Sequence, residues 1–166
     1  MPDSGSGIRV NHPEPITIGG KTFRVDPFDV PGIATGSIYT ALDALGTKWE
    51  IAVPKSGIVH TAWSFDSDNE QLDFSVHLFM KPFTGGTDHD AFAMVEGDRA
   101  FIAGPAILYD TFVGTSGAAW GGADNVGWSY VAPDRKLYGQ VVTQDAPTYA
   151  TGKGLTLGFT ILEDVE

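Results

Sequence analysis

Alternating apolar and polar residues dominate the middle of the chain. In residues 58–65 and again in residues 72–80, every second side chain lies on one largely apolar face, which is typical of strands with one buried side. Polar turn formers separate the two runs at residues 67–70. Folding the chain about this turn brings the apolar rows together, so we expect an antiparallel hairpin with His60 opposite His77. The expected rows are Val59, Thr61, Trp63 and Phe65 in the first strand and Leu72, Phe74, Val76, Leu78 and Met80 in the second.

The same periodicity predicts further strands on both sides of this hairpin. They are expected at residues 47–53, 101–113, 126–130, 137–141 and 155–161. Before the second of these, Thr87 and the acidic residues after it indicate the start of a short helix over residues 87–95, which Gly97 would end. About seven strands separated by turns favour an all-β fold, an antiparallel β-sandwich or jelly roll with one short helix.

Residues 126–130 and 137–141 are expected to pair as a second hairpin. The chain would turn between them at residues 133–135, Pro-Asp-Arg. This register places Trp128 over Gly139, whose missing side chain leaves room for an indole ring.

The first 31 residues differ from the rest of the chain. A Gly/Ser-rich lead precedes residues 16–25, where a central Gly-Gly pair predicts a tight hairpin because glycine adopts positive φ at both turn positions. Prolines bracket this hairpin, so we expect residues 1–31 to be an arm attached to a sandwich domain of residues 32–166. An isolated hairpin is marginal in water and needs a surface to lie on. The candidate interface residues of this arm are Ile16, Phe23 and Arg24.

Composition supports this fold and narrows the range of partners. The 166 residues include 21 glycines and 10 prolines, and only 19% are charged, which suits many short strands and turns. The net charge of −11 argues against binding to nucleic acid or to anionic membranes, because both attract Lys and Arg. The chain also lacks a long apolar run, a classical secretion signal at its N-terminus, and any cysteine for a disulfide or a thiolate nucleophile.

The residues that could carry chemistry form no complete site. His60 and His77 could share a metal ion if they face each other, but no third ligand lies near, and neither begins the His-x-His pattern of cupin enzymes. The oxygen-rich residues 66–70 could hold Ca²⁺, yet they lack the glycine and terminal glutamate of an EF-hand loop. The glycine-rich tracts at residues 114–122 and 151–154 lack phosphate-loop spacing, and no nucleophile elbow occurs. We therefore expect no enzyme activity, no cofactor and no bound metal.

Trp120 stands apart because it lies in an expected loop beside Gly121 and Gly122, where local packing partners are scarce. An aromatic side chain on a glycine-rich loop can stack on a sugar or anchor a protein interface. It can equally fold back and plug the end of the sandwich. Trp120 is therefore a further candidate interface residue.

In the order of its motifs, the chain resembles a group of small virion proteins of tailed bacteriophages. The motifs are GTKWEIAVPKSGIVHTAWSFD, LDFSVHLFMKPF, TDHDAFAMVEGD, VGWSYVAPDRKLYGQVV and LTLGFTILED, within residues 16–164. The resemblance implies a jelly-roll or β-sandwich protein made in the host cytoplasm and placed on the virion surface. Such a capsid cement or decoration protein would contact the major capsid protein or other virion proteins and form a homo-oligomer, by analogy a trimer. The motifs are strand patterns, so the resemblance assigns no functional residue.

Other functions stay open at this point. A component of the tail, the baseplate or a fibre attachment is consistent with the same resemblance. A carbohydrate-binding module would use Trp120 and other exposed aromatic residues to bind a host glycan, and a cupin-like metal enzyme would use the histidines. Glycan titration separates the carbohydrate-binding module from a virion component, and metal analysis tests the enzyme.

Overall fold

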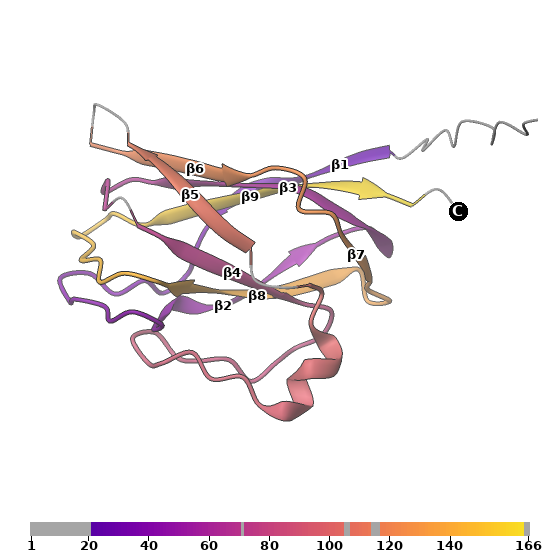
Figure 1. Ribbon diagram of the computed structural model, residues 1–166, viewed down its shortest axis with the longest axis horizontal. Coiled ribbons are helices and arrows are strands. Elements are labelled where there is room, and N and C mark those ends of the chain that lie inside the picture. The colour runs from indigo at the N-terminus through magenta and orange to yellow at the C-terminus, as the bar shows by residue number, and fades with distance from the viewer. Residues whose placement is uncertain (1–20, 71, 105–106, 114–116, 165–166) are drawn as a thin grey trace, which may run out of the picture.

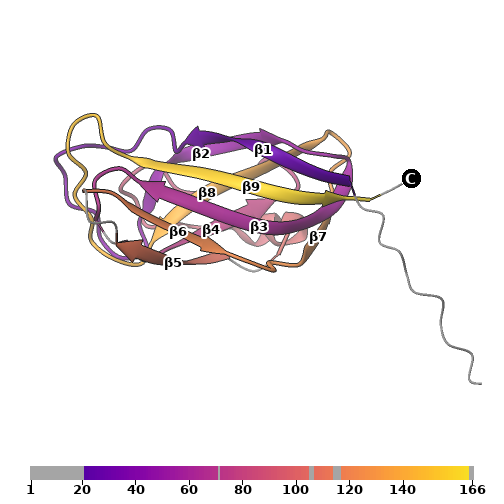
Figure 2. The ribbon, with the colours of Figure 1, turned by 90° about the horizontal axis from the view of Figure 1, so that it is seen from above.

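The computed structural model describes residues 21–164 apart from residues 71, 105–106 and 114–116. Its strands form two antiparallel sheets packed face to face, which confirms the expected all-β sandwich (Figure 1). The larger sheet contains β1 (Lys21–Asp29), β9 (Leu155–Glu163), β3 (Ser56–Asp66), β6 (Ala119–Ala123) and β7 (Trp128–Val131), and the smaller contains β4 (Phe74–Phe79), β8 (Lys136–Thr143) and β2 (Ala44–Ala52). Strand β5 (Ile107–Val113) pairs with both β6 and β4 and joins the sheets along one side. The end strands β1 and β2 lie along the same edge of the molecule (Figure 2), but they do not pair with each other.

The expected central hairpin is wrong, because β3 and β4 belong to different sheets. β3 pairs with β9, β6 and β7, whereas β4 pairs with β8 and β5. His60 and His77 therefore do not face each other across a pair of strands. The apolar row of β4 does face the core, with Leu72, Phe74, Val76 and Leu78 buried. Alternation thus indicated which side of β4 faces the core. The expected neighbour of β4, however, is β3, and β3 lies in the opposite sheet.

A bulge in β3 changes which of its residues face the core. The register with β9 shifts between Val59 and Thr61, so one extra residue, His60, is inserted. An insertion of one residue exchanges the two faces of the rest of the strand. Beyond the bulge, Ala62, Ser64 and Asp66 are buried. Trp63 and Phe65, both expected in the core, lie on the outer face instead.

The second expected hairpin is also wrong, although each of its strands exists. β7 pairs with β3 in the larger sheet, and β8 pairs with β2 and β4 in the smaller one. A Cβ built at Gly139 would collide with the indole of Trp49, whereas one built at Gly104 would collide with that of Trp128. Tryptophan does lie over glycine in this fold, but each tryptophan meets a glycine from a segment distant in sequence.

Residues 21–31 belong to the sandwich, whereas the sequence placed them in an arm. β1 pairs with β9 from Lys21 to Asp29, with an irregularity between Val25 and Phe28 around Pro27. Val25 and Val30 are buried in the core, and Phe28 packs against it. The first strand and the Gly-Gly turn of the expected hairpin, together with Ile16, lie outside the described residues.

The helix expected at residues 87–95 does not form; a short 3-10 helix, η1 (Glu96–Phe101), follows that segment instead. His89 has a φ of 68°, which a continuing helix cannot accommodate. The neighbouring Asp88 carboxylate accepts hydrogen bonds from the Tyr39 hydroxyl and the Gly46 amide, each at 2.6 Å. Tertiary hydrogen bonds therefore hold this segment as a turn against the end of β2.

The connection between β4 and β5 covers the outer face of the smaller sheet. Phe83 stacks on Phe79 with ring centroids 3.9 Å apart. Gln140, fully buried on β8, accepts a hydrogen bond from the Gly86 amide and donates to the Gly86 and Gly46 carbonyls. The larger sheet differs, because Phe65 and Trp120 remain exposed on its outer face.

Candidate functional site

One row of side chains crosses the outer face of the larger sheet. Asp29 of β1 is opposite Thr156 of β9, Thr156 is opposite Phe65 of β3, and Phe65 is opposite Trp120 of β6. We call these four residues the outer row. Phe65 is 43% exposed and Trp120 is 58% exposed, so a carboxylate, a hydroxyl and two aromatic rings share one accessible surface.

The neighbouring row keeps this surface flat. Trp63 lies between Gly158 of β9 and Gly122 of β6 in the strand register. A Cβ built at Gly158 would collide with the Trp63 indole, so the ring lies directly on the β9 backbone. Gly158 thus lets the Trp63 indole lie along the sheet beside the outer row, and Gly122 adds no side chain on the other side of Trp63.

A cavity of about 380 Å³ opens next to Phe65, at the end of the sheet. We call it the end cavity. Its lining comprises Asp29, Val30, Gly32, Ile33, Phe65, Ser67, Gly152, Lys153, Gly154, Leu155 and Thr156. The Thr156 hydroxyl donates to Oδ1 of Asp29 at 2.6 Å, and the Lys153 ammonium donates to the Ser67 carbonyl at 2.9 Å. The cavity therefore combines a carboxylate, an ammonium group and hydroxyls with an aromatic wall.

The acidic loop after β3 shapes this end of the molecule. The buried Asp66 carboxylate accepts hydrogen bonds from the Asp68 and Glu70 amides, and burial raises its pKa. Asp68 and Glu70 in turn accept hydrogen bonds from the Ala150 and Thr148 amides. The carboxylates considered for Ca²⁺ thus join two loops, and the described residues contain no group of three metal-ligating side chains.

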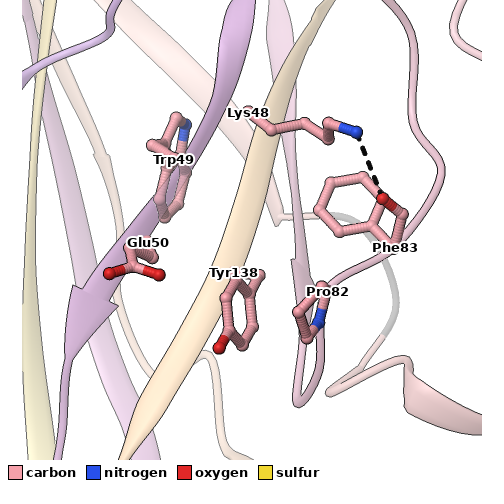
Figure 3. A pocket seen from close by; sticks show the side chains of 6 residues that line it. All are labelled: Lys48, Trp49, Glu50, Pro82, Phe83 and Tyr138. Atoms are coloured by element: carbon pink, nitrogen blue, oxygen red, sulfur yellow. Dashed lines mark hydrogen bonds between the residues drawn. The ribbon is translucent and has the colours of Figure 1, made fainter.

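A second hollow, of about 290 Å³, lies on the smaller sheet (Figure 3). It is lined by Lys48, Trp49, Glu50, Pro82, Phe83 and Tyr138. The Lys48 ammonium donates to the carbonyls of Phe83 and Thr84, and Glu50 forms an ion pair with Lys136. Lys48 thus uses two of its three donors and Glu50 is paired with a cation, whereas Lys153 of the end cavity uses one donor and Asp29 accepts one hydroxyl.

His77 does not form a catalytic pair, although its Nε2 lies 3.1 Å from the Ser75 hydroxyl. Ser75 is only 2% exposed, so a substrate would not reach its oxygen. The imidazole stacks against Phe92 at a centroid distance of 4.6 Å, and burial lowers the pKa of His77. This contact explains His77 as part of the packing on the smaller sheet.

The expected interface residues have different locations. Trp120, expected in a loop, lies on strand β6 within the outer row. Arg24 is exposed on β1, whereas Phe23 is half-buried and packs against the core. Sequence reasoning missed Asp29, Phe65 and Thr156, because only the long-range pairing of β1, β9, β3 and β6 brings them to Trp120.

Comparison with protein-family models and with curated proteins finds no match to the chain. Among the described residues, no helix has the length and apolar character needed to cross a membrane.

Proposed function

We propose that this protein is a bacteriophage virion structural protein, a capsid decoration protein that binds the outside of the shell through protein–protein contacts. The observation that carries the proposal is that the two ends of the larger sheet differ: the N-terminal segment joins one end, and the outer row lies at the other. Lys21 is opposite Glu163 at one end of the β1–β9 pair, and Asp29 is opposite Thr156 at the other (Figure 2). Residues 1–20 therefore join the sandwich at the end away from the outer row. A sandwich tethered at one end and displaying the other suits a protein attached to a particle.

The edge strand β1 supplies a surface for attachment. It is the last strand of its sheet, with no strand on its outer side among the described residues. Such an edge can pair with an extended segment of a neighbouring subunit. We infer that residues 1–20 and the β1 edge bind the capsid or an adjacent copy, giving a trimer. The net charge of −11 favours a basic patch on the partner. In this proposal the protein binds, and it needs neither a metal nor a cofactor.

Binding to particles that lack the protein tests this proposal. Full-length protein and a variant without residues 1–20 would be incubated with such particles, and also with separated heads and tails, and then sedimented. We expect the full-length protein to bind heads, to appear as density outside the shell by electron microscopy, and to elute as a trimer in light-scattering chromatography. The truncated variant should stay folded but remain unbound. Binding to tails alone would favour a baseplate or fibre role, and binding to neither fraction would contradict the proposal.

A further inference from the structure

We propose that the outer row and the end cavity form a binding site for a neutral saccharide. Phe65 and Trp120 provide adjacent aromatic rings on which the apolar face of a sugar can stack. Asp29, Lys153 and Thr156 provide hydrogen-bonding groups next to Phe65 for the sugar hydroxyls. This inference goes beyond the proposed function, because it assigns a ligand to the displayed end of the molecule.

The polar groups of the end cavity retain hydrogen-bonding capacity. Asp29 receives the Thr156 hydroxyl at Oδ1, and its Oδ2 has no hydrogen-bond partner among the described residues. The Lys153 ammonium uses one donor on the Ser67 carbonyl and has three in all. One cavity thus presents both an acceptor and donors. Sugar hydroxyls are donors and acceptors at once, so they can satisfy both groups.

Charge and size favour a neutral saccharide over other ligands. The Asp29 carboxylate and the Lys153 ammonium give the cavity one charge of each sign, so it has no net local charge that favours an ion, and the net charge of −11 on the whole protein disfavours an anion. A cavity of about 380 Å³ is at the small end of the range for ligand pockets, which suits one or two sugar rings better than part of a folded domain. The surface beside it is flat because Gly158 and Gly122 flank Trp63, and a flat surface allows a longer chain of sugars to continue across it.

Titration of the isolated full-length protein with neutral oligosaccharides tests the site. The probes are di- to tetrasaccharides of glucose, galactose, mannose and N-acetylglucosamine, with an oligogalacturonate as the anionic comparison. Binding would be followed by tryptophan fluorescence and by calorimetry. We expect at least one neutral probe to bind and the anionic probe to bind more weakly or not at all.

Two substitutions at Phe65 distinguish stacking from general apolar contact. Phe65→Leu keeps an apolar side chain but removes the ring, and should weaken saccharide binding by about tenfold, as the loss of an anchoring aromatic does. Phe65→Trp keeps a ring and should retain binding. Asp29→Asn should weaken binding severalfold through the lost charge-assisted hydrogen bond. Val131→Ala is the matched control, because Val131 is 59% exposed on β7, outside the outer row.

Thermal melting of each variant would show that it is folded before binding is compared. Absence of binding to every neutral probe would overturn the inference, and so would preferential binding of the oligogalacturonate. Unchanged affinity in Phe65→Leu would show that saccharide binding, if present, lies elsewhere. Because these titrations contain no particles, their failure is distinct from a failure of the protein to bind capsids.

Discussion

A methyl group added at Gly139 should press against the indole of Trp49 and destabilise the sandwich. Gly139 lies on β8, opposite Trp49 of β2 on one side and Leu78 of β4 on the other. Trp49 is 7% exposed, and its ring centroid lies 4.9 Å from that of Phe28 and 6.0 Å from that of Phe159. Because protein interiors are close-packed, the indole can move away from a new Cβ only by displacing these neighbouring rings.

The expected cost follows from this packing. Overpacking of a protein core costs about 1–3 kcal/mol. Gly139→Ala belongs at the upper end, because the new Cβ would fall inside the contact distance of several Trp49 ring atoms. We therefore expect a loss of about 3 kcal/mol in the free energy of unfolding. In a domain of this size about 1 kcal/mol corresponds to about 2–4 °C, so the melting temperature should fall by about 6–12 °C.

Urea and thermal unfolding followed by circular dichroism measure this loss. Gly158→Ala is the matched control, because it meets Trp63, which is only half-buried, lies on the outer face and can turn toward solvent. It should cost less, about 1 kcal/mol. In a Trp49→Leu background the Gly139→Ala penalty should shrink by at least about 1 kcal/mol, since the two residues contact each other. An equal penalty in both backgrounds, or a larger one for Gly158→Ala, would refute the reasoning.

Three further predictions concern the N-terminus, pH and metal ions. Removing residues 1–20 should leave the free energy of unfolding almost unchanged, whereas removing residues 1–31 deletes β1 with buried Val25 and Val30 and should cost about 3–6 kcal/mol. Burial lowers the pKa of His77, so its contribution to stability is present above pH ~6.5 and is lost as the pH falls through the lowered pKa. Thermal melts between pH 7 and 5 should therefore show a steeper loss for the parent than for His77→Gln. A chelator should leave the melting temperature unchanged, because backbone amides bind the carboxylates of the acidic loop.

Specific results would contradict each of these three predictions. Equal stability of the two truncated proteins would mean that β1 does not contribute to the core. A parallel pH dependence for the parent and His77→Gln would mean that His77 does not cause the loss of stability. A melting temperature several degrees lower in chelator would indicate a structural ion that the hydrogen bonds of the loop do not explain.

Strand positions were largely predictable from the sequence, but strand pairing was not. The alternation in β4 identified its buried row correctly because a strand with one face on the core keeps period two. The prediction of strand pairing was wrong because short polar connections suggested hairpins. In the structure the chain instead crosses from one sheet to the other between β3 and β4 and between β7 and β8. Two apolar rows match equally well on neighbouring strands of one sheet and on facing strands of two packed sheets. The sequence pattern alone therefore does not distinguish these two arrangements.

Strand β6 was not predicted because its sequence, Ala-Trp-Gly-Gly-Ala, lacks both alternation and β-branched residues. Its pairing with β3 and β5 forms the strand. The same small residues that hid β6 have a structural role, since Gly122 lies opposite Trp63 and keeps the surface beside it flat. Pairing with the two neighbouring strands thus outweighed the weak intrinsic strand propensity of these residues.

The bulge at His60 connects these errors to the candidate site. Without the extra residue, Trp63 and Phe65 would continue the inward row of Val59 and would be buried. With it, small or polar residues, Ala62 and Ser64, face the core and the aromatic rings face outward. Aromatic side chains that stay exposed gain only part of the free energy that full burial would give, and a contiguous apolar surface is typical of a binding site. The bulge that made the sequence-based register wrong is therefore also the feature that places Phe65 in the outer row. The binding experiments should be directed to this face.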